Sequence, residues 1–143
     1  MTGMAILEEE LGAFSKARDD SGLWAVATHC LYPSNTAVTA FITGGPVNGF
    51  VVSDNGGAIS TLTARGLLVA NADKMLKQFC VRRGLQPSEG AIVTRPVPRM
   101  ALVPAIVMVA NAASAAAHWG VENLKPRHRR DLKKALLDLA MLR

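Results

Sequence analysis

Apolar and polar residues alternate along two early stretches of the chain, 23–32 and 36–43. This spacing of two is typical of strands with one face buried. A Pro-Ser-Asn turn separates the stretches, so the two strands are expected to pair antiparallel. A short third strand over 50–52 completes a meander. Residues 91–94 predict a fourth strand at an edge, because prolines follow at 96 and 98.

Other segments show helical spacing instead, and they complete the predicted fold. Helices are expected over 4–18, from 59 to Gly66, over 71–83, over 99–120 and over about 127–142, with Gly120 ending the fourth. The prediction is one α+β domain over 1–143. It has a small antiparallel sheet of three to four strands packed with four or five helices, and the Ala-rich helix lies on the apolar face of the sheet.

Length and composition agree with one folded domain. The chain has 143 residues, half of them hydrophobic, which suits a single core and argues against long disorder. Cys30 and Cys80 lack the spacing of a metal site or a disulfide framework. Residues 1–10 carry three consecutive glutamates and do not resemble a secretory signal. A cytoplasmic protein without metal or cofactor is therefore expected.

One uncharged stretch of 22 residues, Met100–Val121, is long enough to span a bilayer. Eight of its residues are Ala, and Pro104, Asn111, Ser114 and His118 all oppose insertion. The last three share one helical face. The stretch therefore predicts a buried helix of a soluble protein, and no membrane partner is expected.

The net charge of +5 is unevenly distributed, because residues 1–60 carry −4 and residues 61–143 carry +9. The excess is concentrated in segment 124–143, which we interpret as a basic, amphipathic C-terminal helix. Six basic residues occupy ten positions there, with only Asp131 opposing them. These residues are Lys125, Arg127, Arg129, Arg130, Lys133 and Lys134.

Such a basic face is suited to binding phosphates or an acidic protein surface. It is equally consistent with a solvated helix face that keeps the protein soluble. Aromatic residues make up only 5% of the chain and none lies in this segment, so stacking on single-stranded bases is not expected. A basic face continuous with Arg82, Arg83 or Arg95 would favour binding.

Asp54 and His118 are secondary candidates, although no catalytic motif is present. Asp54 ends the third predicted strand beside two glycines, where a carboxylate serves as a metal ligand, a base, or the acceptor that a tight turn needs. We favour the turn. His118 stands in no recognisable catalytic motif, so a hydrogen-bonded helix face explains it better than a hydrolase triad.

The segment from Phe50 to Leu62, FVVSDNGGAISTL, resembles a signature of an uncharacterised bacterial and phage family, number eighteen twenty-eight among the domains of unknown function. Its pattern is a strand, an acidic glycine turn and a helix beginning Ile-Ser-x-Leu. The resemblance covers about residues 4–119 and leaves out the basic segment. It implies an accessory protein of bacterial genomes or mobile elements, with no assigned activity.

The sequence predicts a non-enzymatic protein that binds nucleic acid or an acidic protein through its basic C-terminal helix. Two alternatives stay open. One is a metal-dependent, nuclease-like enzyme that uses Asp54. The other is a structural domain that forms a homo-oligomer through the Ala-rich helix.

Overall fold

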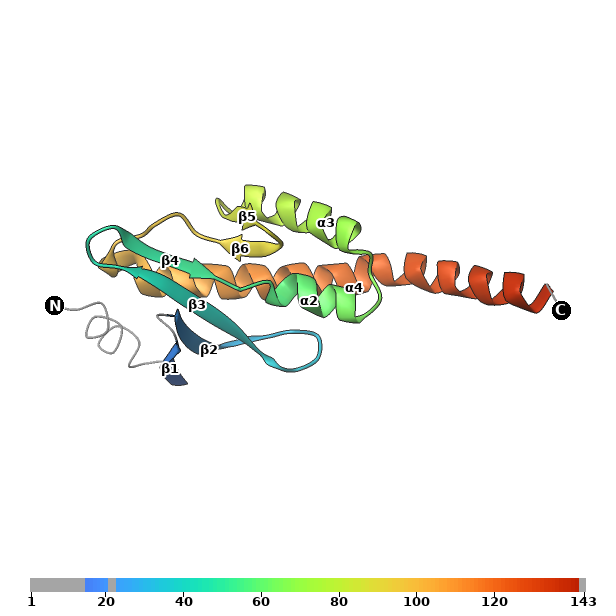
Figure 1. The fold of residues 1–143 in the computed structure, drawn as a ribbon, viewed down its shortest axis with the longest axis horizontal. Coiled ribbons are helices and arrows are strands. Elements are labelled where there is room, and N and C mark those ends of the chain that lie inside the picture. The colour runs from blue at the N-terminus through green and yellow to red at the C-terminus, as the bar shows by residue number, and fades with distance from the viewer. Residues whose placement is uncertain (1–14, 21–22, 142–143) are drawn as a thin grey trace.

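The computed structural model describes residues 15–20 and 23–141, with side chains for 23–123. It has an α+β fold, as predicted, in which one sheet and the helices share a single core (Figure 1). The elements, in chain order, are β1 (Ser15–Asp20), β2 (Leu23–Leu31), β3 (Ala37–Gly45), β4 (Gly49–Ser53), α2 (Gly57–Ala64), α3 (Val69–Arg82), β5 (Gln86–Ser88), β6 (Ala91–Val93), the 3-10 helix η1 (Arg99–Ala101) and α4 (Leu102–Met141).

The sheet has six strands in the order β1-β2-β3-β4-β6-β5, and all neighbours are antiparallel. The predicted meander is confirmed as β2, β3 and β4. Val26 pairs with Ala40, and Ile42 pairs with Val52. All four side chains are fully buried, so the alternation in the sequence correctly identified the face of the sheet that packs on the core.

Two strands differ from the prediction. The helix expected over 4–18 is wrong for residues 15–18, which belong to the edge strand β1, and residues 1–14 lie outside the described part of the chain. Four of the six β1 residues are charged, so no apolar alternation identifies the strand. Strand β5 was not predicted, and it pairs with β6 on the outer side, so the expectation that residues 91–94 form an edge strand is wrong. Glu89 and Gly90 adopt positive φ at the tip of the β5–β6 hairpin.

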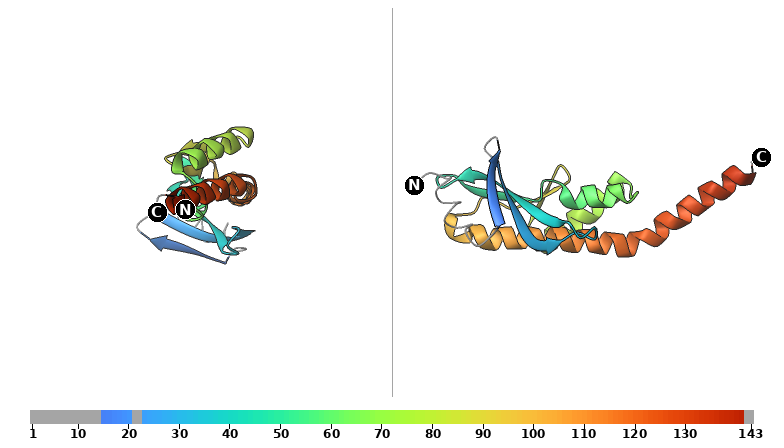
Figure 2. Two further views of the ribbon diagram at one scale, coloured as in Figure 1. Left: turned by 90° about the vertical axis from the view of Figure 1, so that its right-hand side faces the viewer. Right: turned by 90° about the horizontal axis from the view of Figure 1, so that it is seen from below.

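Helix α4 forms the centre of the core. It crosses the face of the sheet and then packs against α2 and α3 (Figures 1 and 2). Its inward side chains are largely small, which lets neighbouring backbones approach closely. The buried ones are Leu102, Ala105, Ile106, Val109, Ala110, Ala112, Ala113, Ala116 and Ala117. Residues 99–123 form a helical stretch long and apolar enough to cross a membrane, and half of its most apolar window is buried inside the fold.

The helix does not end at Gly120, so the prediction of two helices with a break between them is wrong. A Cβ on Gly120 would lie 2.5 Å from Cδ2 of Leu62 and 3.3 Å from Sδ of Met75. The glycine therefore permits close packing of α4 on α2 and α3, and the helix continues through it. Segment 124–143 is consequently not a separate helix, because α4 runs unbroken to Met141.

The predicted four or five helices become three α-helices and one 3-10 helix among the described residues. The helices expected over 99–120 and 127–142 are one helix. The helix expected over 4–18 falls partly on β1 and partly outside the described residues. Pro126 lies within α4 and cannot donate a backbone hydrogen bond, a usual cause of helix bending. Figure 2 shows α4 bending as it leaves the body.

Candidate functional site

The six basic candidate residues, Lys125, Arg127, Arg129, Arg130, Lys133 and Lys134, all fall on the C-terminal part of α4. The backbone there is helical, and the side chains lie outside the described residues. This part of α4 projects beyond α2 and α3 as a single rod (Figure 1). The helical conformation expected for this segment is present, but as a continuation of the core helix α4 rather than as a separate helix.

The charge of the protein divides at the point where α4 leaves the body. Residues 1–123 contain nine Lys and Arg and nine Asp and Glu, whereas residues 124–143 contain seven basic and two acidic residues. The formal charge of the first part is therefore zero. All of the net charge of +5 resides in the C-terminal part of α4 and the two residues that follow it.

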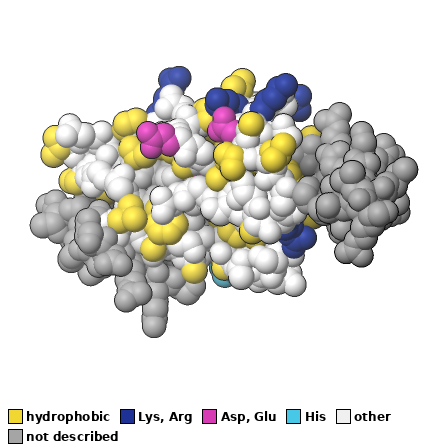
Figure 3. Space-filling model, turned by 45° about the vertical axis from the view of Figure 1, so that its right-hand side comes forward, with side chains coloured by type: hydrophobic (Ala, Val, Ile, Leu, Met, Phe, Trp, Pro, Cys, Tyr) yellow, Lys and Arg dark blue, Asp and Glu magenta, His cyan; other side chains and the backbone are white. Residues whose placement is uncertain are grey.

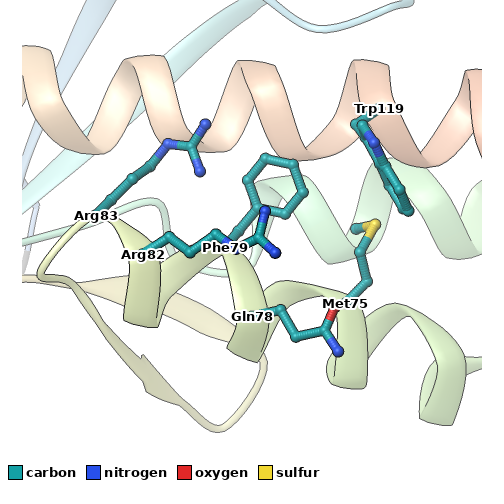
Figure 4. A pocket seen from close by; sticks show the side chains of 6 residues that line it. All are labelled: Met75, Gln78, Phe79, Arg82, Arg83 and Trp119. Atoms are coloured by element: carbon teal, nitrogen blue, oxygen red, sulfur yellow. The ribbon is translucent and has the colours of Figure 1, made fainter.

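A pocket with a cavity volume of about 310 Å³ lies between α3 and α4, close to this projection (Figure 4). It combines aromatic rings, two guanidinium groups and an amide. Its lining residues are Met75, Gln78, Phe79, Arg82, Arg83 and Trp119. We call this the α3–α4 pocket. In Figure 3, Lys and Arg side chains gather along the upper edge of the molecule, where α3 runs.

The aromatic rings of the α3–α4 pocket are held in a fixed arrangement. The rings of Phe79 and Trp119 meet edge to face, with centroids 6.0 Å apart and an interplanar angle of 63°. The guanidinium of Arg83 lies 4.6 Å from the centroid of Phe79, within the range of a cation–π interaction. Trp119 nevertheless keeps 43% of its surface exposed, so ring area is left for a ligand.

Arg82 and Arg83 were expected from the sequence as possible extensions of the basic face, but the pocket that they line was not expected. Phe79 and Trp119 are 40 positions apart in the sequence, and only the packing of α3 on α4 brings them together. The one sequence signal was Trp119 itself, an aromatic residue inside an uncharged stretch, and it gives no indication of its partner Phe79. Arg95, the third cation considered with this pair, is exposed after β6 and does not line the pocket.

Asp54 occupies the turn between β4 and α2 and is 2% exposed. Its Oδ1 accepts hydrogen bonds from the backbone N–H groups of Gly56 (3.0 Å) and Ile92 (2.8 Å), and its Oδ2 accepts one from Ala58 (3.1 Å). Burial raises the pKa of the Asp54 carboxyl, and the backbone donors partly oppose that rise. Both oxygens are thus used by the backbone, which favours the turn interpretation.

His118 belongs to a polar seam between α4 and the end of β2. The carbonyl oxygen of Leu31 lies 3.1 Å from His118 Nε2 and accepts a hydrogen bond of 2.7 Å from Ser114 Oγ. The Cys30 thiol donates to Asn111 Oδ1 at 3.2 Å. The hydrogen-bonded helix face predicted for these residues is therefore present, and it anchors β2 to α4. No group of three or more His, Cys, Asp or Glu able to hold a metal occurs among the described residues.

Comparison of the chain with protein-family models, curated proteins and solved structures finds no match. The resemblance to the family numbered eighteen twenty-eight therefore stays a prediction. Function has to be argued from the charge and geometry of this chain.

Proposed function

We propose that this protein binds nucleic acid through phosphate contacts made by the C-terminal part of α4, and that it is not an enzyme. The observation that carries this proposal is the confinement of the whole net charge to residues 124–143, of which 124–141 form one projecting helix. Clustered Lys and Arg displace counterions from a phosphate backbone, which supplies affinity without sequence readout.

The shape of the projection supports the same proposal. An α-helix with its side chains is about 10–12 Å across, and the major groove of duplex DNA is about 12 Å wide. Residues 124–141 give a helix of about 27 Å. A rod of this length can follow one groove without bringing the neutral body into contact with the duplex.

The enzymatic alternative has less support. A metal-dependent nuclease needs carboxylate oxygens that are open to a cation, whereas the Asp54 oxygens accept three backbone hydrogen bonds. An acidic protein partner fits the charge equally well, and we make it an outcome of the test.

Binding to a 20-base-pair duplex tests the proposal, measured by fluorescence anisotropy at several salt concentrations. Affinity should fall steeply as salt rises, with a logarithmic slope of about −0.9 for each phosphate contacted. A variant with Gln at the six basic positions keeps helix propensity. It should lose most of the affinity and most of the slope.

Arg65→Gln combined with Arg95→Gln is the matched control, because it removes two exposed charges from the body and should leave binding unchanged. Two results would overturn the proposal. One is duplex affinity that is absent at low salt or indifferent to salt. The other is binding to polyglutamate without binding to the duplex, which would identify an acidic protein as the partner.

A further inference from the structure

We infer that the α3–α4 pocket binds one unpaired nucleobase together with its phosphate. The inference rests on the proposed function for the class of ligand, and it adds a second site with a different chemistry. The C-terminal part of α4 contacts phosphates only, whereas the α3–α4 pocket supplies rings as well as cations.

The chemistry of the pocket matches a single nucleotide. A nucleotide joins a planar ring and a negative phosphate within one unit, and the pocket places the Phe79–Trp119 pair beside the guanidinium groups of Arg82 and Arg83. Bases stack on aromatic side chains regardless of sequence. Gln78 adds an exposed amide that can both donate to and accept from a base edge.

The size of the pocket sets the number of bases. A cavity of about 310 Å³ lies at the lower end of the range for small-molecule sites, about 300–1,000 Å³. It therefore holds one base rather than a stacked run. A paired base cannot enter it, so the ligand is an unpaired position in a single strand, a loop or an end.

The position of the pocket connects it to the basic helix. Arg82, Arg83 and Phe79 line one side, and Trp119 closes the side nearer the exit of α4 (Figure 4). Arg130 follows Trp119 by eleven residues, which is three helical turns or about 17 Å. A strand with its base in the pocket can therefore reach the basic projection over this distance.

Two oligonucleotides of equal charge test the inference: a 12-nucleotide oligothymidylate and a 12-nucleotide abasic strand with the same phosphates. The full chain carrying Trp24→Phe leaves Trp119 as its sole tryptophan, so fluorescence quenching reports on the pocket. The oligothymidylate should quench Trp119 and bind about 5- to 150-fold more tightly than the abasic strand, as expected for stacking of one base.

Trp119→Ala should abolish this preference and leave affinity for the abasic strand unchanged. Met108→Ala is the matched control, because Met108 is exposed to a similar degree, 41%, on the same helix and should keep the preference. Arg82→Gln with Arg83→Gln should weaken binding of both strands and reduce the salt slope. Equal affinity of wild-type protein for the two strands would overturn the inference without need of any variant.

The outcomes separate this inference from the proposed function. If the six-Gln variant binds duplex as wild type does while the oligothymidylate preference depends on Trp119, the proposed function fails and the pocket stands. If duplex binding depends on the six charges and the two single strands bind equally, the pocket fails alone. Binding of an acidic aromatic peptide without either strand overturns both.

Discussion

Asp54 and Ile92 are joined by two hydrogen bonds. The Ile92 N–H donates to Asp54 Oδ1 at 2.8 Å, and the Asp54 N–H donates to the Ile92 carbonyl at 3.0 Å. One residue of the β4–α2 turn thereby holds strand β6 in place. β6 pairs with β4 at Ser53 and Val93, and Thr94 and Val97 extend the contact along β4. The Asp54–Ile92 link secures the end of this contact next to α2.

Replacing Asp54 with Ala should destabilise the fold by about 3 kcal/mol or more. The change leaves three backbone N–H groups without their acceptor, and each unsatisfied buried group costs about 1–3 kcal/mol. Urea denaturation measures the loss. Ser53→Ala is the control, because Ser53 Oγ accepts one exposed bond from the same turn and its loss should cost less than about 1 kcal/mol. Equal losses for the two variants would contradict this account of the turn.

The pH dependence of stability should carry a contribution from Asp54. Burial raises the pKa of its carboxyl from 3.8, so the folded protein holds the proton at pH values where the unfolded chain has released it. The contribution is present in full below 3.8 and is lost as pH rises to the raised value. Wild type should therefore lose stability relative to Asp54→Asn through that interval. If wild type instead gained stability relative to Asp54→Asn as pH rises, the backbone hydrogen bonds would lower the pKa of the carboxyl by more than burial raises it.

Gly120→Ala should destabilise the protein although Ala favours helix. The new methyl would overlap the fully buried Leu62, and overpacking costs about 1–3 kcal/mol, while the gain in propensity is about 1 kcal/mol. A net loss of up to about 2 kcal/mol is expected in thermal or urea unfolding. Gly45→Ala, where nothing lies within 4 Å of the added Cβ, should stay within about 0.5 kcal/mol of wild type.

The Cys80 thiol should resist alkylation in the native protein. It is 1% exposed, and burial raises its pKa to about 11, so only about one thiol in a thousand is ionised at pH 8. In a Cys30→Ser variant, iodoacetamide should add no label at pH 8, as read by mass spectrometry. The same variant in urea should label fully. Equally fast labelling under both conditions would show that Cys80 is open to solvent.

The whole protein should remain in solution without detergent. The apolar stretch of α4 is half buried by the sheet and by α2 and α3, and its polar residues Ser114 and His118 are within hydrogen-bonding distance of β2. High-speed centrifugation of a cell lysate should leave the protein in the supernatant. Sedimentation with the membrane fraction, and release only by detergent, would contradict this reading of α4.

The sequence predicted those parts of the fold in which buried residues recur at the regular spacing of a strand or a helix. The alternation around Val38 and Ile42 gave the correct face of β3, and helical spacing found α2 and α3 because each has one buried side. Gly120 was wrongly expected to end a helix, because glycine generally destabilises a helix. The close packing of Leu62, which requires a glycine at this position, cannot be seen in the sequence.

The candidate site also contains residues that the local sequence indicated and residues that it did not. The basic residues of α4 were found because they cluster within ten positions of the sequence, and Asp54 was found because turns have a characteristic composition. The α3–α4 pocket depends on two aromatic residues from separate helices. No local pattern relates Phe79 to Trp119, so the pocket needed the tertiary structure.

The central position of α4 also determines when this chain can fold during synthesis. The sheet, α2 and α3 all bury their apolar faces on α4, which follows each of them in the chain. Before residue 120 has been added, those faces have no partner and stay exposed to other chains.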